Sequence, residues 1–259
     1  MDQSAMFTFL GTGTSGGVPS LGCDCAVCRS LNPLDHRLRS AALLECGSTR
    51  LLIDCGPDIR QQLMPFPFKP ITAVLLTHVH YDHVGGLDDL RPFSVFGDIN
   101  VYADQITTDG IHRVMPYCFT EKLYPGVPKL KVHTIDPHHP FTIGGIRVMP
   151  ICVMHGKMPI LAYRFGSLAY ITDMKSISDE DREKLVGVHT LVVNALRWEK
   201  VHHSHMLVHD AIDFARSIGA QRTYFTHMTH RIGLHDEANG RLPKGFAFAY
   251  DGQSLRVKL

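Results

Sequence analysis

Short apolar runs recur along most of the chain, separated by turn residues and helical patterns, and they predict a series of β-strands. Half of these runs contain two or more β-branched residues. The predicted strands cover residues 6–10, 42–46, 50–54, 73–77, 147–153, 160–165, 168–172, 191–194, 223–226 and 247–250. Gly47 with Ser48, and Gly166 with Ser167, fit tight turns between neighbouring strands, so we expect antiparallel hairpins at both places.

Helical periodicity is clearest over residues 207–218, where apolar residues recur on one face. These residues are Leu207, Ala211, Phe214, Ala215 and Ile218. Gly219 follows, at the position where a glycine commonly ends a helix. Weaker patterns predict helices over residues 178–185, with Ser178 as N-cap, and 107–115. Strands that alternate with helices indicate a mixed α/β fold, and we expect a single domain over residues 1–259 because no linker or repeat interrupts the pattern.

The composition is that of a folded chain with little net charge. Of the 259 residues, 44% are hydrophobic, and 26 Lys and Arg offset 25 Asp and Glu to leave a formal charge of +1. This balance gives little attraction for nucleic acid or an anionic membrane, so we expect neither as a partner. The first residues lack a secretory signal pattern, and no run approaches about 18 apolar residues, which predicts a cytoplasmic protein with reduced thiols.

Histidine is the unusual component, with 17 copies, and it is a common metal ligand and general acid or base. His78, His80, Asp82 and His83 follow directly after the predicted strand 73–77. Beyond a strand end, His78 and His80 can converge on one cation as alternate side chains, while Asp82 and His83 can reach a second one from the following turn. The alternative is a solvated loop that happens to be rich in histidine.

Three further candidate ligands, His155, Asp173 and His227, come just after other predicted strands. The carboxyl ends of strands are where α/β folds place their sites, which favours the metal interpretation. Taken alone, His155 reads as an ordinary loop histidine, and Asp173 reads equally well as the cap of a following helix.

The run His-x-His-x-Asp-His, followed by Gly-Gly, resembles the signature of the metallo-β-lactamase superfamily. The resemblance covers nearly the whole chain and implies a four-layer αββα sandwich with two divalent metal ions at the edge of its sheets. The implied ligands are His78, His80 and His155 for one metal, Asp82, His83 and His227 for the other, and Asp173 as the bridge. Asp54 would orient the histidine loop. Imidazole and carboxylate ligands suit zinc or manganese, and iron as well.

A second group of metal ligands is indicated by Cys23, Cys25 and Cys28, three thiols within six residues. In a reducing compartment this spacing predicts a structural zinc site that lacks one ligand, and the alternative is a set of free or redox-active thiols. Spacing alone leaves the fourth ligand open. The candidates are His36, Cys46, Cys55 and His230.

The cysteine segment resembles that of PhnP-type cyclic phosphodiesterases, a branch of the same superfamily, and this resemblance selects His230 as the fourth ligand. It implies hydrolysis of a small phosphodiester, such as a ribose 1,2-cyclic phosphate, by a hydroxide held between the two active-site metals. Asp82 would orient that hydroxide, and His205 would stabilise the transition state or protonate the leaving oxygen. His202, His203 and His209 crowd the same stretch, so the role of His205 depends on the resemblance.

Other functions remain open at this stage. The Gly-rich segment 9–19 also resembles transfer-RNA 3′-processing endonucleases, and it either lies against the metal centre or only connects two elements. Against an endonuclease, we find no Lys-rich arm and little net charge. A non-catalytic metal-binding protein and a homodimer are further alternatives. Lys157, Arg197 and Trp198 are candidate contacts for a substrate phosphate or base, although solvated surface residues of these types are more common.

Overall fold

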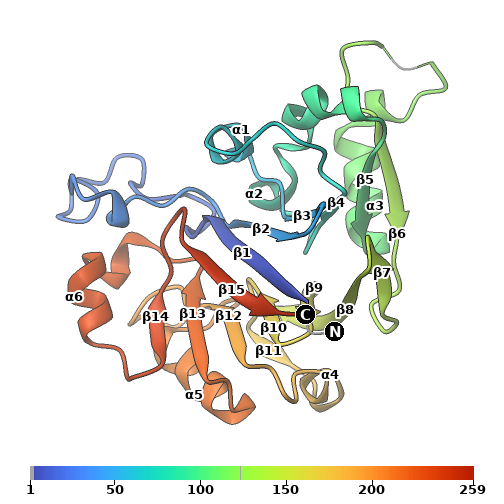
Figure 1. The fold of residues 1–259 in the computed structure, drawn as a ribbon. Helices are drawn as coiled ribbons and strands as arrows, with labels where there is room; N and C mark the ends of the chain where they lie inside the picture. Colours follow the sequence, from blue (N-terminus) through green and yellow to red (C-terminus); the bar gives the residue numbers. More distant parts are fainter. Residues whose placement is uncertain (1–2, 123) are drawn as a thin grey trace.

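The computed structural model describes residues 3–122 and 124–259, and within them two β-sheets form the centre of the molecule (Figure 1). The first sheet has the order β15 (Ser254–Lys258), β1 (Ser4–Gly11), β2 (Ala41–Cys46), β3 (Thr49–Ile53), β4 (Ala73–Leu75), β5 (Ile99–Ala103) and β6 (Leu130–Thr134). The second has the order β11 (Ser176–Ile177), β8 (Ile146–His155), β9 (Met158–Phe165), β10 (Leu168–Ile171), β12 (Thr190–Asn194), β13 (Arg222–Thr226) and β14 (Phe246–Phe248), and β7 (Phe141–Ile143) pairs with β8.

Helices cover the outer faces of these sheets. The α-helices are α1 (Ile59–Leu63), α2 (Tyr81–Val84), α3 (Gln105–Val114), α4 (Asp179–Glu183), α5 (Val208–Ile218) and α6 (His235–Gly240). Four 3₁₀ segments complete the described elements, and they are η1 (Pro33–Asp35), η2 (Leu87–Phe96), η3 (Pro116–Cys118) and η4 (His230–Ile232). Within the part of the chain that the structure describes, no helix has the length and apolar character needed to cross a membrane.

Three apolar clusters establish the layers. Phe7 and Phe9 from β1 meet Tyr163 and Tyr170 from the second sheet, so this cluster lies between the two sheets. A second cluster packs Ala211 and Ala215 of α5 against the outer face of the second sheet, and a third packs α1, η2 and α3 against the outer face of the first. The order of layers is therefore helix, sheet, sheet, helix, which confirms the predicted αββα sandwich.

Strand direction gathers loops at one edge. β3, β4, β5 and β6 run parallel, as do β10, β12, β13 and β14, while β2 with β3 and β9 with β10 form the two predicted antiparallel hairpins. Parallel strands end at the same edge of their sheet, so the residues after β4, β10, β12 and β13 are brought close together. The candidate ligands lie at this edge.

The ten predicted strands and three predicted helices are all present, with shifted ends. Two strand ends at the site shift by two residues: β8 extends to His155 and not only to Val153, so His155 is its last residue, and β4 ends at Leu75 and not at Thr77. Thr77 leaves the ladder because its backbone N–H donates to the side chain of Asp54, at 2.8 Å. α5 ends as expected at Gly219, whose φ of 77° is the left-handed conformation. In α4, the Ser178 side chain accepts a hydrogen bond from the backbone N–H of Asp181, as an N-cap does.

Five described strands were not predicted: β5, β6, β7, β11 and β15. β6 and β15 are the edge strands of the first sheet, and β15 alternates buried Leu255 and Val257 with exposed polar residues. A half-buried edge strand needs fewer apolar residues than a central one, so its apolar run is broken. α1, α2 and α6 were also missed because each has at most six residues, fewer than the two turns over which an apolar face recurs.

Candidate metal centres

The backbone turns sharply at three of the residues that surround the predicted dinuclear centre. Asp54, Asp173 and His227 have φ values of 62°, 57° and 57°, in the left-handed region that residues other than glycine seldom adopt. Asp54 directly follows β3, and His227 directly follows β13. Asp173 is separated from the end of β10 only by Thr172. Strained conformations of this kind persist where surrounding structure fixes them, and they concentrate at functional sites. Here they turn three side chains toward the same edge.

The first predicted set of ligands is brought together. The ring nitrogens of His78, His80 and His155 lie within 4.8 Å of one another, and Nε2 of His78 is 3.0 Å from Nδ1 of His80. Nδ1 of His155 lies 2.8 Å from the carbonyl oxygen of Asp173 and 3.0 Å from that of Ser204. A carbonyl oxygen only accepts, so Nδ1 of His155 carries the proton and Nε2 is left as the ligand atom.

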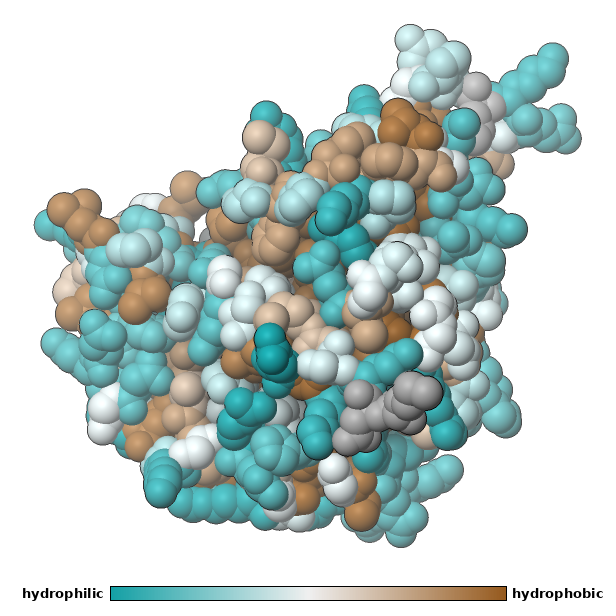
Figure 2. Space-filling view, viewed as in Figure 1, coloured by the Kyte–Doolittle hydropathy of each residue, from teal (hydrophilic) through white to brown (hydrophobic). Residues whose placement is uncertain are grey.

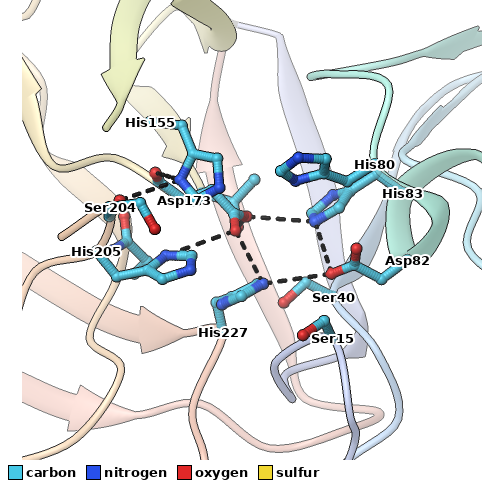
Figure 3. Close-up of polar contacts among 12 residues, drawn as sticks. Ser15, Ser40, His80, Asp82, His83, His155, Asp173, Ser204, His205 and His227 are labelled. Atoms are coloured by element: carbon cyan, nitrogen blue, oxygen red, sulfur yellow. Dashed lines mark hydrogen bonds and ion pairs between the residues drawn. The ribbon is translucent and has the colours of Figure 1, made fainter. Parts of the chain in front are cut away.

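The second predicted set also converges, around two carboxylates (Figure 3). Nε2 of His83 lies 3.2 Å from Asp82 and 3.3 Å from Asp173, and Nε2 of His227 lies 3.0 Å from Asp173 and 3.6 Å from Asp82. Asp173 thus contacts both histidines and stands between the two sets, as a bridging ligand would. The structure brings together all seven residues of the predicted centre, which we call the histidine centre. They are His78, His80, Asp82, His83, His155, Asp173 and His227.

Asp54 fixes the positions of His83 and Thr77 through hydrogen bonds to its carboxylate. Its carboxylate accepts a 2.7 Å hydrogen bond from Nδ1 of His83 and further bonds from the backbone and side chain of Thr77, and it is completely buried. Because the Nδ1 proton of His83 is fixed toward Asp54, the opposite nitrogen points into the centre. Asp54 therefore orients the histidine loop, as the resemblance implied.

The residues fit a bound cation. Nε2 of His83 and both ring nitrogens of His227 are buried without a hydrogen-bond partner among the described residues. A buried polar atom without a partner is costly, and a divalent cation between these nitrogens and the carboxylates would satisfy them. The donor set of imidazole and carboxylate suits zinc or manganese.

Charge and burial oppose each other in the histidine centre. Burial disfavours ionisation of Asp173, but the positive charges of His227 and His83 hold the pKa of its carboxyl well below the ordinary value. Burial also disfavours a charged His227, yet the carboxylate of Asp173 prevails and raises the pKa of that imidazole to about 9. The carboxylates thus attract positive charge to a site with little access to water, which is the environment of a divalent cation.

His205 lies beside the centre without belonging to the predicted ligand sets. Its Nδ1 is 3.6 Å from Asp173, and its ring stacks on that of His227 with centroids 4.9 Å apart. Burial, and then the positive charge of His227, lowers the pKa of His205 to about 2, so the imidazole is neutral in this environment. Nδ1 of His205 is buried without a hydrogen-bond partner in the described chain. It is therefore available to a group that the structure does not hold.

The four residues predicted for the structural zinc also lie together, and we call them the cysteine cluster. The sulfur atoms of Cys23, Cys25 and Cys28 and a ring nitrogen of His230 lie within 4.8 Å of one another. Sγ of Cys28 is 3.1 Å from Nδ1 of His230. Burial raises the pKa of Cys28 to about 11, whereas a backbone N–H of Cys28 lowers the pKa of Cys25. Three thiols and one imidazole this close together could hold one metal ion, and this donor set is one that zinc favours.

The other three candidates for the fourth position lie elsewhere. His36 contacts the carbonyl oxygen of Ser30, and Cys46 contacts the backbone of Ser4 in the first sheet. Cys55 is completely buried beside the histidine loop, where its N–H donates to the carbonyl oxygen of His83. Geometry therefore favours His230, in agreement with the resemblance.

The Gly-rich segment lies against the histidine centre and does more than connect two elements. The backbone of Thr14 donates to the carbonyl oxygen of Met228, and the backbone of Met228 donates to that of Thr12. Figure 3 shows Ser15 beside Asp82 and His227. A Cβ added at Gly16 would meet no atom within 4 Å, so the space beside this turn is open.

The candidate substrate contacts differ in their surroundings. Lys157 is exposed, and Nε of Arg197 donates to the carbonyl oxygen of Lys200 within its own loop. Trp198 is fixed in place, because Nε1 donates to the carbonyl oxygen of Ile232 at 2.7 Å and the guanidinium of Arg241 lies 4.0 Å above its ring. Its side chain thus anchors the loop that carries His205.

Sequence reasoning missed one residue that positions the centre. Asn194 accepts from the backbone N–H of Met174 and donates to its carbonyl oxygen, at 2.7 and 3.0 Å, so it clamps the turn that begins at Asp173. A polar residue that ends the apolar run 191–194 was the available signal. Such a residue reads as a strand end until the neighbouring turn is known.

Comparisons with known proteins agree with this architecture. The family model described as a beta-lactamase superfamily domain matches residues 49–228. A crystal structure of a new diphosphatase from the PhnP family is 38% identical, with a TM-score of 0.93, and the match covers 100% of this chain and 99% of that one. An octanoyltransferase of Porphyromonas gingivalis is 43% identical over 94% of this chain, and the chain spans about half (50%) of the length of that relative. Zinc-bound PqqB from Methylobacterium extorquens shares the fold at 22% identity, with a TM-score of 0.79 over 96% of this chain and 99% of that one.

The family model matches more than half of the chain, and the two sheets have the architecture of that family. The chain therefore belongs to the metallo-β-lactamase superfamily.

Proposed function

We propose that this protein is a metal-dependent phosphodiesterase of the PhnP type, which hydrolyses a small phosphodiester such as a ribose 1,2-cyclic phosphate. The observation that carries the proposal is the convergence of the seven residues of the histidine centre around Asp173, with buried ring nitrogens that form no hydrogen bond within the described residues. His78, His80 and His155 would hold one divalent cation, and Asp82, His83 and His227 the other. The similarity to a diphosphatase of the PhnP family over the whole chain supports the same class of chemistry, cleavage of a phosphorus–oxygen bond by water.

When bound, two zinc or manganese ions would activate a water molecule and offset the negative charge of the phosphate. The residues of the chain fix where that chemistry takes place. Asp173 lies between the two sets of histidines, and Asp54 fixes the orientation of His83. In addition to its role as a ligand, the carboxylate of Asp82 would accept a hydrogen bond from the attacking water and so orient it.

His205 acts on the leaving oxygen in this proposal. In hydrolysis, the water oxygen bonds to phosphorus, the bond from phosphorus to the leaving oxygen breaks, and that oxygen gains a proton. Nδ1 of His205 lies 3.6 Å from Asp173 and forms no hydrogen bond within the described residues, so it can reach a hydrogen-bonding group on this side of the centre. A hydrogen bond from this ring stabilises the charge that develops on the leaving oxygen.

The cysteine cluster would hold a structural zinc ion. His227 and His230 are three residues apart on one turn, so a zinc ion bound by Cys23, Cys25, Cys28 and His230 would tie the N-terminal loop to a ligand of the active site. The octanoyltransferase name belongs to a relative of about twice the matched length, and we do not extend acyl transfer to this chain.

The proposal is tested by a substrate panel with metal-loaded protein. The panel contains a ribose 1,2-cyclic phosphate, a 2′,3′-cyclic nucleotide, a linear phosphodiester, a diphosphate ester and a precursor transfer RNA. We expect turnover of the small phosphodiesters, loss of that turnover with a chelator, and its return with zinc or manganese. Activity on the transfer RNA alone would replace the proposal with an endonuclease, and no hydrolysis of any compound would leave a non-catalytic metal-binding protein.

A further inference from the structure

A tight turn of the Gly-rich segment lies beside the histidine centre. The backbone N–H of Gly17 donates to the carbonyl oxygen of Thr14 at 2.8 Å, and this bond closes the turn around Ser15 and Gly16. At the base of the turn, the N–H of Thr14 donates to the carbonyl oxygen of Met228 at 3.0 Å. Met228 directly follows a predicted ligand of the histidine centre in the sequence, so this bond fixes the turn close to that centre.

The tip of this turn presents hydrogen-bond donors that no described residue uses. Ser15 and Gly16 are exposed, and within the part of the chain that the structure describes, neither their backbone N–H groups nor the hydroxyl of Ser15 forms a hydrogen bond. A Cβ at Gly16 would meet no atom within 4 Å, so a ligand can approach the backbone there. Figure 3 shows Ser15 beside Asp82 and His227, so these donors lie next to the second set of predicted ligands.

Arg39 holds the tip of the turn in place. Its Nε donates to the carbonyl oxygen of Ser15 at 2.8 Å, and its Nη1 donates to Oδ1 of Asp58, also at 2.8 Å. Oδ2 of Asp58 accepts from the backbone N–H of Arg39 at 2.8 Å. Asp58 stands at the N-cap of α1, where a carboxylate commonly accepts from the helix backbone, but it makes no such bond here. Both of its oxygens are bound by Arg39, so Asp58 fixes this arginine and, through it, the turn.

The bond from Arg39 also sets the direction of a backbone donor. The peptide group between Ser15 and Gly16 is trans, so its C=O and its N–H point in opposite directions. Since Arg39 binds the C=O, the N–H of Gly16 points away from that guanidinium. Neutral donors of this kind suit a phosphate, because they donate to its oxygens without repelling the metal ions beside them.

We propose that Ser15 and Gly16 bind the scissile phosphate, with the hydroxyl of Ser15 and the N–H of Gly16 donating to one of its non-bridging oxygens. Arg39 is the positioning residue that holds this pair of donors in place. The inference rests on the proposed function and adds to it a contact from the chain itself to the phosphate. Because both donors are neutral and face the reacting phosphate, the contact serves any small phosphodiester or diphosphate, whatever its leaving group.

Binding of inorganic phosphate tests the contact without any turnover. Phosphate is titrated calorimetrically into metal-loaded protein from which unbound metal has been removed. In Ser15→Ala we expect the Kd to rise about tenfold or more, as the loss of one hydrogen bond to a charged group produces. Ser15→Thr keeps the hydroxyl and should bind phosphate nearly as the parent does. Ser48→Ala is the matched control, because Ser48 is an exposed serine in the turn before β3, at the end of that strand opposite Asp54.

A double-mutant cycle tests the positioning role of Arg39. Arg39→Gln should weaken phosphate binding in the parent, and its effect should be smaller in Ser15→Ala, because the two residues act through one contact. Equal effects of Arg39→Gln in the two backgrounds would reject the positioning role, since a purely structural effect is additive. Arg216→Gln is the control, because Arg216 is an exposed cation on α5 that pairs with Asp213 at 3.7 Å, and it should leave the Kd of the parent unchanged.

The outcomes separate this inference from the proposed function. Weaker phosphate binding in Ser15→Ala, but not in Ser15→Thr or Ser48→Ala, supports the contact even if no compound of the substrate panel is hydrolysed, an outcome that rejects only the proposed function. If the parent hydrolyses the panel and Ser15→Ala keeps both the parental kcat/KM and the parental Kd for phosphate, the proposed function stands and the contact is rejected. A metal-loaded parent that binds no phosphate also rejects the contact.

Discussion

The histidine centre and the cysteine cluster assemble their residues in opposite ways. The histidine centre draws side chains from the segment after β4 that includes α2, from the last residue of β8, and from the loops after β10 and β13, and most of them are buried against two sheets. The cysteine cluster draws three residues from one loop, with Cys25 exposed, and the apolar cluster beneath it contains only Val18, Val27 and Cys28 as buried members. Figure 1 shows this loop projecting from the body of the molecule, and Figure 2 shows hydrophobic residues at its outer end.

Because of this difference, we expect a metal to have a different role in each region. The sheets and Asp54 already fix the side chains of the histidine centre, so a metal bound there is free to serve chemistry. The loop of the cysteine cluster has little core of its own, so a metal bound there would replace the missing core. Loss of a residue should therefore reduce activity at the first region and stability at the second.

The largest effect is expected from Asp173→Asn. Asparagine tolerates the left-handed backbone of this position, so the change removes the bridging charge and leaves the fold intact. Several kcal/mol of transition-state stabilisation depend on correctly held metals, and kcat/KM should fall about a thousandfold or more. Steady-state kinetics on the best substrate of the panel, together with circular dichroism, measure this. Near-parental activity of this variant would show that Asp173 is not a ligand that the reaction needs.

His205→Ala should have the next largest effect, and it separates catalysis from metal binding. Loss of a group that assists the leaving oxygen lowers kcat by about a hundredfold or more. Because His205 is outside the ligand sets, elemental analysis should find the parental metal content. If turnover is unchanged, His205 has no part in the mechanism, and if metal is lost along with turnover, it is a ligand.

Asp54→Asn makes the same chemical change as Asp173→Asn, but at a residue that contacts the ligand His83 and would not contact a metal itself. Asparagine still accepts from the backbone of Thr77 but no longer accepts the proton of His83. We expect metal affinity to fall by roughly 10-fold to 100-fold, with activity recovered at high metal concentration. Chelator competition followed by metal titration measures this. Activity that added metal does not restore would show that Asp54 does more than orient His83.

Cys25→Ser should have the smallest effect on activity and a clear effect on stability. A loss of about 2 kcal/mol would lower Tm by roughly 4–8 °C for a chain of this size. Cys46→Ser is the control, because Cys46 is a partly exposed thiol outside the cluster, and it should leave Tm unchanged. Equal Tm values for the two variants would contradict a structural role for the cluster.

The same contrast explains how much of the site the sequence predicts. The run from His78 to His83 is local, so spacing alone suggested a metal, and strand-end placement added Asp173 and His227. His155 also follows a predicted strand, but alone it reads as a loop histidine, and the resemblance was needed to assign it as a ligand and to select His230 among four candidates. The clamp of Asn194 on Met174 joins residues twenty positions apart, and no pattern along the chain indicates it. The fold followed similar rules, since strands with continuous buried runs such as β3, β10 and β12 were predicted, whereas β5 and β15, which alternate buried residues with more exposed ones, were not.

The most direct test of the account is the metal content of the purified, metal-replete protein, compared with that of Cys25→Ser and Asp173→Asn. We predict about three metal ions per chain in the parent, two in Cys25→Ser with the histidine centre still filled, and a loss from the histidine centre alone in Asp173→Asn. Two metals in the parent, unchanged in Cys25→Ser, would reject the structural zinc. A parent that binds no metal at the histidine centre would contradict the account as a whole.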